Sequence, residues 1–192
     1  MSRFNRSWTI KHVITGRVND LDPRFDCNYL AVDQGRVIAA VGSCIYAWNI
    51  VTADVDFVMR GHNDGVSAIA KQGGKLFSVA RDGDVKAWSL SDGRCLHSTT
   101  LAQICTPGMV CHMVANGGHL VVSHKAGPRS AHAVYVWSVA EEPFSVTQCV
   151  ELDTEDACAT LLSAGGTVYA GVAARLHAWS AAVPLSATGA RS

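Results

Sequence analysis

Short runs of apolar residues, broken by glycine-containing polar turns, recur along most of the chain. In one typical stretch, apolar runs at 66–70, 75–79 and 85–90 are separated by turns at 72–74 and 81–84. Runs of this length between turn residues are typical of β-strands, and Asp-Gly pairs supply the positive φ that a tight hairpin needs. A helical period of 3.6 residues is sustained nowhere. The pattern therefore predicts an all-β chain.

Two sequence features recur four times, always in the same order. The first is a glycine turn that leads into a short apolar strand, at 35–38, 73–77, 117–121 and 165–169. The second is a tryptophan within a strand, and the four repeat tryptophans are Trp48, Trp88, Trp137 and Trp179. Two features that recur together at the same spacing indicate an internal repeat of about 40 residues. A four-stranded unit of this length cannot bury both of its faces alone, so we expect the units to stack radially on their neighbours.

The second unit resembles the WD-repeat (G-beta-like repeat) β-propeller family. Gly61-His62 stands where that family has its Gly-His pair, and Trp88-Ser89 stands at its Trp-Asp dipeptide. The resemblance extends over roughly residues 8–181. It implies β-propeller blades of four antiparallel strands, about four of them here, forming a partial or small propeller.

The resemblance also implies a structural tetrad of hydrogen-bonded side chains. Its members are His62, Ser78, Asp82 and Trp88. A buried imidazole needs partners for both nitrogens, and the aspartate of a tight turn can reach one of them, so we assign these residues a structural role and no catalytic one. The other units depart from this pattern, because the positions that correspond to Asp82 hold Gly42, Ala131 and Ala173.

We expect one N-terminal segment, four blades and a tail. Residues 1–26 hold a strand and an acidic loop, and the remaining units are blade 1 at 27–60, blade 2 at 61–101, blade 3 at 102–150 with an inserted loop at 124–132, an incomplete blade 4 at 151–183 and a polar tail at 184–192. Residues 8–14 alternate like the outermost strand of a blade. They either complete the last blade of a small four-bladed ring or belong to a partial propeller whose later blades are missing or come from a second chain, and we favour the partial propeller.

The third unit carries extra residues between two apolar strands. This inserted loop is basic and contains Gly127-Pro128, and its candidate partner-binding residues are His124, Lys125, Arg129 and His132. Such a loop suits an acidic protein segment or a phosphate group. The alternative is a tolerated surface insertion. The segment 19–26 is acidic, and it is either a complementary site or a solvated loop.

Charge and cysteine content argue against several classes of binding site. Sixteen basic residues balance sixteen acidic ones, which argues against a DNA-binding footprint and against a polybasic membrane patch. No apolar run reaches the roughly 20 residues that a membrane-spanning helix needs. Seven cysteines without a C-x-x-C pair indicate free thiols in a reducing compartment, and Cys105, Cys111 and His112 fit no zinc pattern. We therefore expect no metal, no cofactor and a cytoplasmic location, with organellar import as the alternative because residues 1–19 lack acids.

The sequence favours a non-catalytic protein–protein interaction scaffold of WD-repeat type that binds partners through its rim loops. The alternative is a structural subunit of a large ribonucleoprotein or organellar assembly with incidental, weak RNA contact. Enzymatic activity is not expected, because the chain contains no phosphate-binding glycine motif and no nucleophile elbow. The expected partners are other proteins, among them a second chain that completes the propeller.

Overall fold

The computed structural model describes residues 27–100, 109–125, 132–141, 144–152, 158–172 and 175–180. Within these ranges the chain forms fifteen β-strands and no helix. The strands make four antiparallel sheets, and in each sheet the neighbours follow chain order. The predicted N-terminal strand at 8–14, the acidic segment 19–26, the tip of the inserted loop and the polar tail lie outside the described residues.

Each sheet is a simple meander of consecutive strands. The first sheet holds β1 (Cys27–Asp33), β2 (Arg36–Val41), β3 (Cys44–Asn49) and β4 (Val55–Met59). The second holds β5 (Val66–Gln72), β6 (Lys75–Ala80), β7 (Asp84–Ser89) and β8 (Cys95–Thr100). The third holds β9 (Met109–Asn116), β10 (His119–Lys125), β11 (His132–Glu141) and β12 (Phe144–Leu152). The fourth holds β13 (Cys158–Ala164), β14 (Thr167–Val172) and β15 (Arg175–Ser180).

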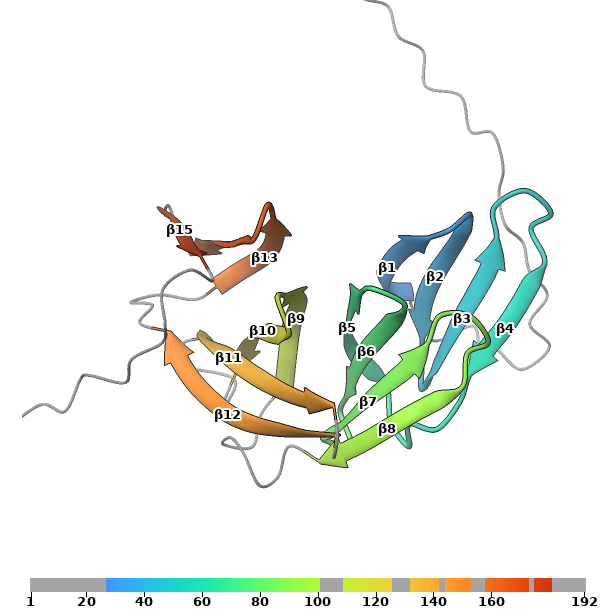
Figure 1. Ribbon diagram of the computed structural model, residues 1–192, viewed down its shortest axis with the longest axis horizontal. Coiled ribbons are helices and arrows are strands. Elements are labelled where there is room, and N and C mark those ends of the chain that lie inside the picture. Colours follow the sequence, from blue (N-terminus) through green and yellow to red (C-terminus); the bar gives the residue numbers. More distant parts are fainter. Residues whose placement is uncertain are drawn as a thin grey trace, which may run out of the picture.

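The four sheets lie in an arc around an open centre, as Figure 1 shows. The first strand of each sheet faces that centre, and β1, β5, β9 and β13 contact one another in succession. The last strands, β4, β8 and β12, lie on the outside of the arc. Four-stranded antiparallel sheets around a common centre are propeller blades. The predicted fold class, an all-β partial propeller, is therefore confirmed.

Apolar side chains on both faces of the sheets hold the arc together. One buried cluster joins Ile38 and Ala47 of the first sheet to Leu76 and Trp88 of the second. The equivalent cluster between the second and third sheets contains Trp137. Trp179 packs against the cluster between the third and fourth sheets. Each of these three tryptophans therefore lies on the face that packs against the preceding sheet.

A polar side chain at the end of the first strand also joins the second sheet to the third and the third sheet to the fourth. The Gln72 amide oxygen, oriented toward its donors, accepts hydrogen bonds from the backbone N–H groups of Gly117 and Gly118 at 3.2 and 2.9 Å. Asn116 Nδ2 donates to the backbone oxygen of Gly166 at 3.0 Å. Both side chains come from the last residue of a first strand and reach the hairpin turn of the following sheet. These contacts set the position of one sheet along its neighbour.

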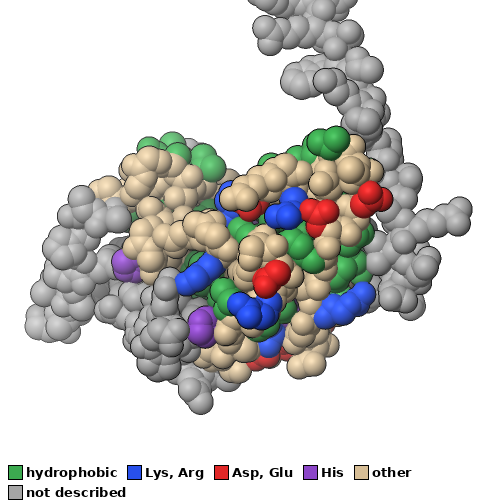
Figure 2. All heavy atoms as spheres, turned by 45° about the vertical axis from the view of Figure 1, so that its right-hand side comes forward, with side chains coloured by type: hydrophobic (Ala, Val, Ile, Leu, Met, Phe, Trp, Pro, Cys, Tyr) green, Lys and Arg blue, Asp and Glu red, His purple; other side chains and the backbone are tan. Residues whose placement is uncertain are grey.

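Two ion pairs lie at the surface of the first two sheets, and one of them links the two sheets. Lys71 Nζ lies 2.8 Å from Asp33 Oδ1, and it joins β5 to the last residue of β1. Arg36 Nε lies 2.6 Å from Asp56 Oδ2 within the first sheet. Figure 2 shows basic and acidic side chains interspersed on the face of the molecule that it presents. Among the described residues, the face in Figure 2 therefore shows no large patch of a single charge sign.

Gly93 provides a test of the packing between the outer parts of the first two sheets. It has a positive φ of 74° in the β7–β8 turn, and an added Cβ would collide with the ring of Phe57 in β4. Gly83, in the β6–β7 turn, also has a positive φ, but an added Cβ would meet open space. We expect Gly83→Ala to lower the free energy of unfolding by about 1 kcal/mol and Gly93→Ala by about 2–4 kcal/mol, because only the second substitution adds a clash. Urea unfolding measures both values, and equal losses would contradict the close packing at Phe57.

Candidate functional site

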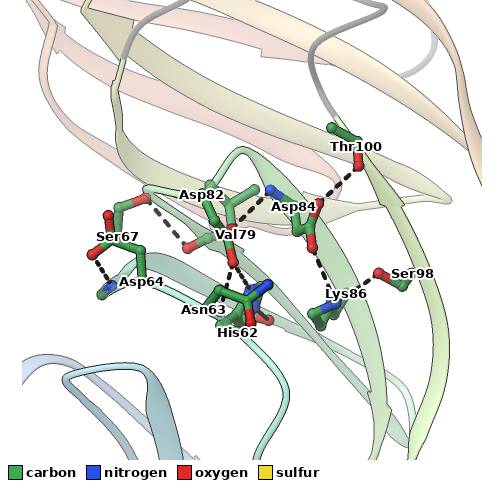
Figure 3. A network of polar contacts seen from close by, with 12 residues as sticks. His62, Asn63, Asp64, Ser67, Val79, Asp82, Asp84, Lys86, Ser98 and Thr100 are labelled. Atoms are coloured by element: carbon green, nitrogen blue, oxygen red, sulfur yellow. Dashed lines mark hydrogen bonds and ion pairs between the residues drawn. The ribbon is translucent and has the colours of Figure 1, made fainter.

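The polar side chains that the sequence singles out meet in the second sheet. His62 lies between β4 and β5, Ser78 lies in β6, Asp82 lies in the β6–β7 turn and Trp88 lies in β7. The tight turn at Gly83 brings Asp82 back toward the start of β5, where His62 is placed. Figure 3 shows His62 and Asp82 directed toward each other across this end of the sheet.

Ser78 is the centre of the arrangement. The Trp88 indole N–H donates to Ser78 Oγ at 2.7 Å. His62 Nε2 lies 2.7 Å from the same oxygen. If Ser78 Oγ accepts from the indole and donates its own proton to Nε2, the neutral imidazole carries its proton on Nδ1. Nδ1 is the nitrogen that faces Asp82, at 3.6 Å from Oδ2, which is too long for a direct hydrogen bond.

Asp82 holds the turn as well as facing the imidazole. Its Oδ2 accepts the backbone N–H of Asn63 at 2.8 Å, and its Oδ1 accepts the backbone N–H of Asp84 at 2.9 Å. Burial acts to raise the pKa of Asp82, but these two backbone donors and the nearby His62 hold it below its usual value. Asp82 therefore remains a carboxylate and ties the segment before β5 to the β6–β7 turn.

The burial of His62 determines its charge state. Burial lowers the pKa of His62 below 6.5, although the neighbouring Asp82 carboxylate acts to raise it. His62 is therefore neutral near pH 7, as its contact with Ser78 requires. Ser78 is 0% exposed, so a substrate cannot reach the hydroxyl. The arrangement joins three segments of one blade, and it leaves no accessible nucleophile.

The other described sheets lack this arrangement. In the first and third sheets the positions equivalent to Ser78 hold Ala39 and Val122, two residues beyond the partner of each tryptophan. The indole nitrogens of Trp48 and Trp137 are buried without a hydrogen-bond partner in the part of the chain that the structure describes. Those blades therefore depend on apolar packing around the indole.

The sequence did not predict a neighbouring network of polar side chains. The ammonium group of the buried Lys86 in β7 lies 3.3 Å from Asp84 Oδ2 and 2.8 Å from Ser98 Oγ. Thr100 Oγ1 donates to Asp84 Oδ1 at 2.8 Å, so the network joins β7 to the outer strand β8 (Figure 3). The spacing of Asp84 and Lys86, two residues apart on one strand, is the only local signal for this network, and the contact with β8 cannot be predicted from it.

The inserted loop of the third sheet joins β10 to β11. His124 and Lys125 are the last two residues of β10, and His132 is the first residue of β11, paired with Lys125. The backbone thus brings three of the four candidate partner-binding residues to one end of the sheet. The fourth, Arg129, lies outside the described residues. This connection is equivalent to the β6–β7 turn that carries Asp82, so both occur at the same strand ends in neighbouring sheets.

Among the described side chains, no three histidine, cysteine or acidic groups gather closely enough to hold a metal ion. The described ranges also contain no helix with the length and apolar character needed to cross a membrane.

Comparisons with known sequences give a partial match. No family model matches the chain. Among curated proteins, THO complex subunit 6 of Arabidopsis thaliana is 26% identical over 81 residues. That match covers 40% of this chain and 22% of the relative, so the chain corresponds to only a small part of its length.

Solved structures give longer matches. The computationally designed Ika8 protein superposes with a TM-score of 0.58 at 21% identity, over 79% of this chain and 44% of that chain. The designed Ika4 protein gives a TM-score of 0.58 at 18% identity, over 82% of this chain and 92% of that chain. The β-propeller domain of Cps50 (Swd1) from Myceliophteria thermophila gives a TM-score of 0.55 at 13% identity, over 82% of this chain and 55% of that chain. At these identities the likeness concerns the fold alone, and that fold is a β-propeller.

Loss of the central hydroxyl should destabilise the second sheet. Ser78→Ala leaves the buried indole N–H and the buried imidazole nitrogen each without a partner, so we expect the free energy of unfolding to fall by about 2–4 kcal/mol. Ser91→Ala, in an exposed turn, is the matched control and should change it by less than about 0.5 kcal/mol. Chemical unfolding followed by tryptophan fluorescence measures both. A loss below about 1 kcal/mol for Ser78→Ala would contradict the role assigned to the hydroxyl.

The lowered pKa of His62 predicts a pH dependence of stability. Below pH 6.5 the unfolded chain takes up a proton at this residue more readily than the folded chain, so stability is full above that pH and falls as the pH drops toward the folded pKa. The lowered pKa of Asp82 acts in the same direction, but only below 3.8. Urea midpoints between pH 7.5 and 5 should decrease more steeply for the wild type than for His62→Asn. Equal slopes in the two proteins would show that His62 is not held neutral by burial.

Proposed function

We propose that this chain is a WD-repeat-type propeller segment that acts as a non-catalytic scaffold for protein–protein interactions. One observation carries the proposal. The side chains that come nearest to a reactive set, His62, Ser78 and Asp82, are engaged within the blade, and Ser78 is fully buried. The polar chemistry of the second sheet therefore serves the fold, and partner binding is assigned to the loops that join the strands.

The comparisons support this proposal in two ways. The sequence match is to a protein that is named as a subunit of a complex, and the structural matches include a natural β-propeller domain. Both are consistent with a chain that works by binding other proteins. The Gly61-His62 and Trp88 positions of the second sheet support a relationship to the WD-repeat family.

The inserted loop between β10 and β11 is the proposed contact site. Its sequence contains Lys125 and Arg129, and acidic protein segments are the partners that such basic side chains suit. The mixture of charges on the side shown in Figure 2 favours a protein partner over RNA there, because nucleic-acid binding depends on a basic excess. The free thiols of Cys44 and Cys95 support a reducing compartment, and we propose the cytoplasm.

Reversing the loop charge tests the contact. The double variant Lys125→Glu/Arg129→Glu should lose partners in affinity purification with mass spectrometry, with recovery reduced about tenfold, because two favourable charge contacts become repulsive. Lys75→Glu/Arg94→Glu changes the net charge equally at the opposite strand ends and should retain the partners. Identical partner sets for all three proteins would refute the loop contact. Recovery of RNA that decreases with salt would support the ribonucleoprotein alternative instead.

A further inference from the structure

The β9–β10 hairpin lies between two neighbouring sheets and is hydrogen-bonded to both. Its first strand, β9, contacts β5 of the second sheet and β13 of the fourth (Figure 1). The turn consists of Gly117 and Gly118, which both have a positive φ and are exposed, and Asn116 is the last residue before it. The backbone N–H of Gly117 donates to the Gln72 amide oxygen at 3.2 Å. Asn116 Nδ2 donates to the backbone oxygen of Gly166 at 3.0 Å.

Asn116 and Gly117 form a pair in which an asparagine side chain can react with the chain itself. The amide nitrogen of the following residue attacks Asn116 Cγ, and a glycine at that position has no Cβ to hinder the approach. The chain contains six asparagines, and Asn116 is the one that a glycine follows. Both turn glycines are exposed, so water and hydroxide reach the pair. The hairpin therefore holds the reacting groups of a deamidation.

The reaction consumes water, releases ammonia and involves no oxidation or reduction. The Gly117 nitrogen gives its proton to solvent and bonds to Asn116 Cγ. The Cγ–Nδ2 bond then breaks, and the departing nitrogen takes one proton from solvent and leaves as ammonia. Water opens the resulting cyclic succinimide at one of its two carbonyl groups. Opening at Cγ gives aspartate, whereas opening at the backbone carbonyl gives isoaspartate, in which the chain runs through the side-chain carbonyl.

The two hydrogen bonds oppose this reaction while the sheets are packed. The Gly117 N–H is directed toward Gln72 of the second sheet, and this contact holds the proton that the nitrogen must lose. The Asn116 amide is directed toward Gly166 of the fourth sheet. The attacking nitrogen and the group that it attacks are thus held by different neighbours. Ring closure therefore requires that a joint between sheets opens locally.

We propose that Asn116 is a deamidation site that the packing of the neighbouring sheets holds unreacted, and that its reaction in turn loosens the fourth sheet. The aspartate product has no N–H for the Gly166 carbonyl, and a carboxylate oxygen then faces that oxygen. Isoaspartate adds a backbone atom beside the turn and disturbs the pairing of residue 116 with His119. Either product removes the polar contact between the third and fourth sheets. The inference concerns sheet packing and does not depend on the proposed scaffold function.

Mass spectrometry of the full chain tests the site. The protein is incubated in mildly alkaline buffer, and the peptide that contains Asn116 is followed over time, with chromatographic separation of the aspartate and isoaspartate forms. Asn49, which Ile50 follows, is the internal control and should stay intact. We expect native Asn116 to react at least about tenfold more slowly than in the urea-unfolded chain, because the reaction requires opening. Equal native and unfolded rates, or no reaction in the unfolded chain, would overturn the proposal.

Variants at Gln72 test the protection. Gln72→Leu offers no acceptor, so the rate at Asn116 should rise by about tenfold. Gln72→Glu keeps an oxygen for the N–H groups of the turn and should react no faster than the wild type. Gly83→Ala, at the opposite strand ends of the second sheet, lowers stability without touching the joint and should leave the rate within about twofold of the wild type.

The pattern among these variants decides the outcome. Circular dichroism checks that each one folds, and Gln72→Ser, which is too short to reach the turn, takes the place of Gln72→Leu if that variant does not fold. Equal rates for Gln72→Leu and the wild type would overturn the proposal. Equal acceleration in Gln72→Leu, Gln72→Glu and Gly83→Ala would also overturn it, because the rate would then follow overall stability and not the acceptor.

Hydrogen exchange tests the effect on the fourth sheet. Asn116→Asp reproduces the aspartate product, and the backbone amides of β14 should exchange about tenfold faster than in the wild type, because the joint has lost its donor. Amides of β2 in the first sheet are the control and should keep their protection. Unchanged protection of β14 in Asn116→Asp would refute the loosening of the fourth sheet.

Discussion

The structure depends on the packing of each tryptophan-bearing sheet face against the sheet before it. The second sheet shows why this packing is obligatory. It buries Leu76 and Trp88 on one face and Phe77 and Val79 on the other, in two separate clusters. A single sheet with two apolar faces cannot shield both from water, so each needs a neighbour on either side. The arc follows from this requirement.

The free energies of apolar burial and of an unpaired N–H explain why the polar tetrad occurs in one blade and is missing from others. Burial of an indole removes about 150–250 Å² from water, which at about 25 cal/mol per Å² contributes roughly 4–6 kcal/mol. An unpaired buried N–H costs about 1–3 kcal/mol. Apolar burial therefore exceeds the penalty for an orphaned N–H, such as that of Trp137, and a blade tolerates the loss of its serine. Where Ser78 is present, its hydrogen bonds add stability and fix the strand positions.

The sequence allowed the fold class to be predicted because its signals are local. Each signal occupies a stretch of about ten residues or fewer: a glycine turn, a short apolar run, or a tryptophan at a fixed place in its unit. The contacts between sheets are different. Gln72 meets Gly117 and Gly118 across more than 40 residues, and nothing near Gln72 indicates that its amide accepts rather than donates. The network of Lys86 with Ser98 likewise depends on which residues the outer strand β8 places opposite β7. Such contacts are properties of the assembled arc.

Strand ends and sheet faces offer two independent kinds of surface. The β10–β11 connection lies at strand ends, whereas Leu162, Leu176 and Leu30 lie on the faces of sheets. In a propeller these two surfaces are roughly perpendicular, because the loops emerge along the central axis and the faces look around it. A partner bound at the rim therefore spans neighbouring sheets without covering the faces through which sheets stack. It follows that a partner can occupy the rim while the sheets stay packed on one another, and that changes in one surface leave the chemistry of the other intact.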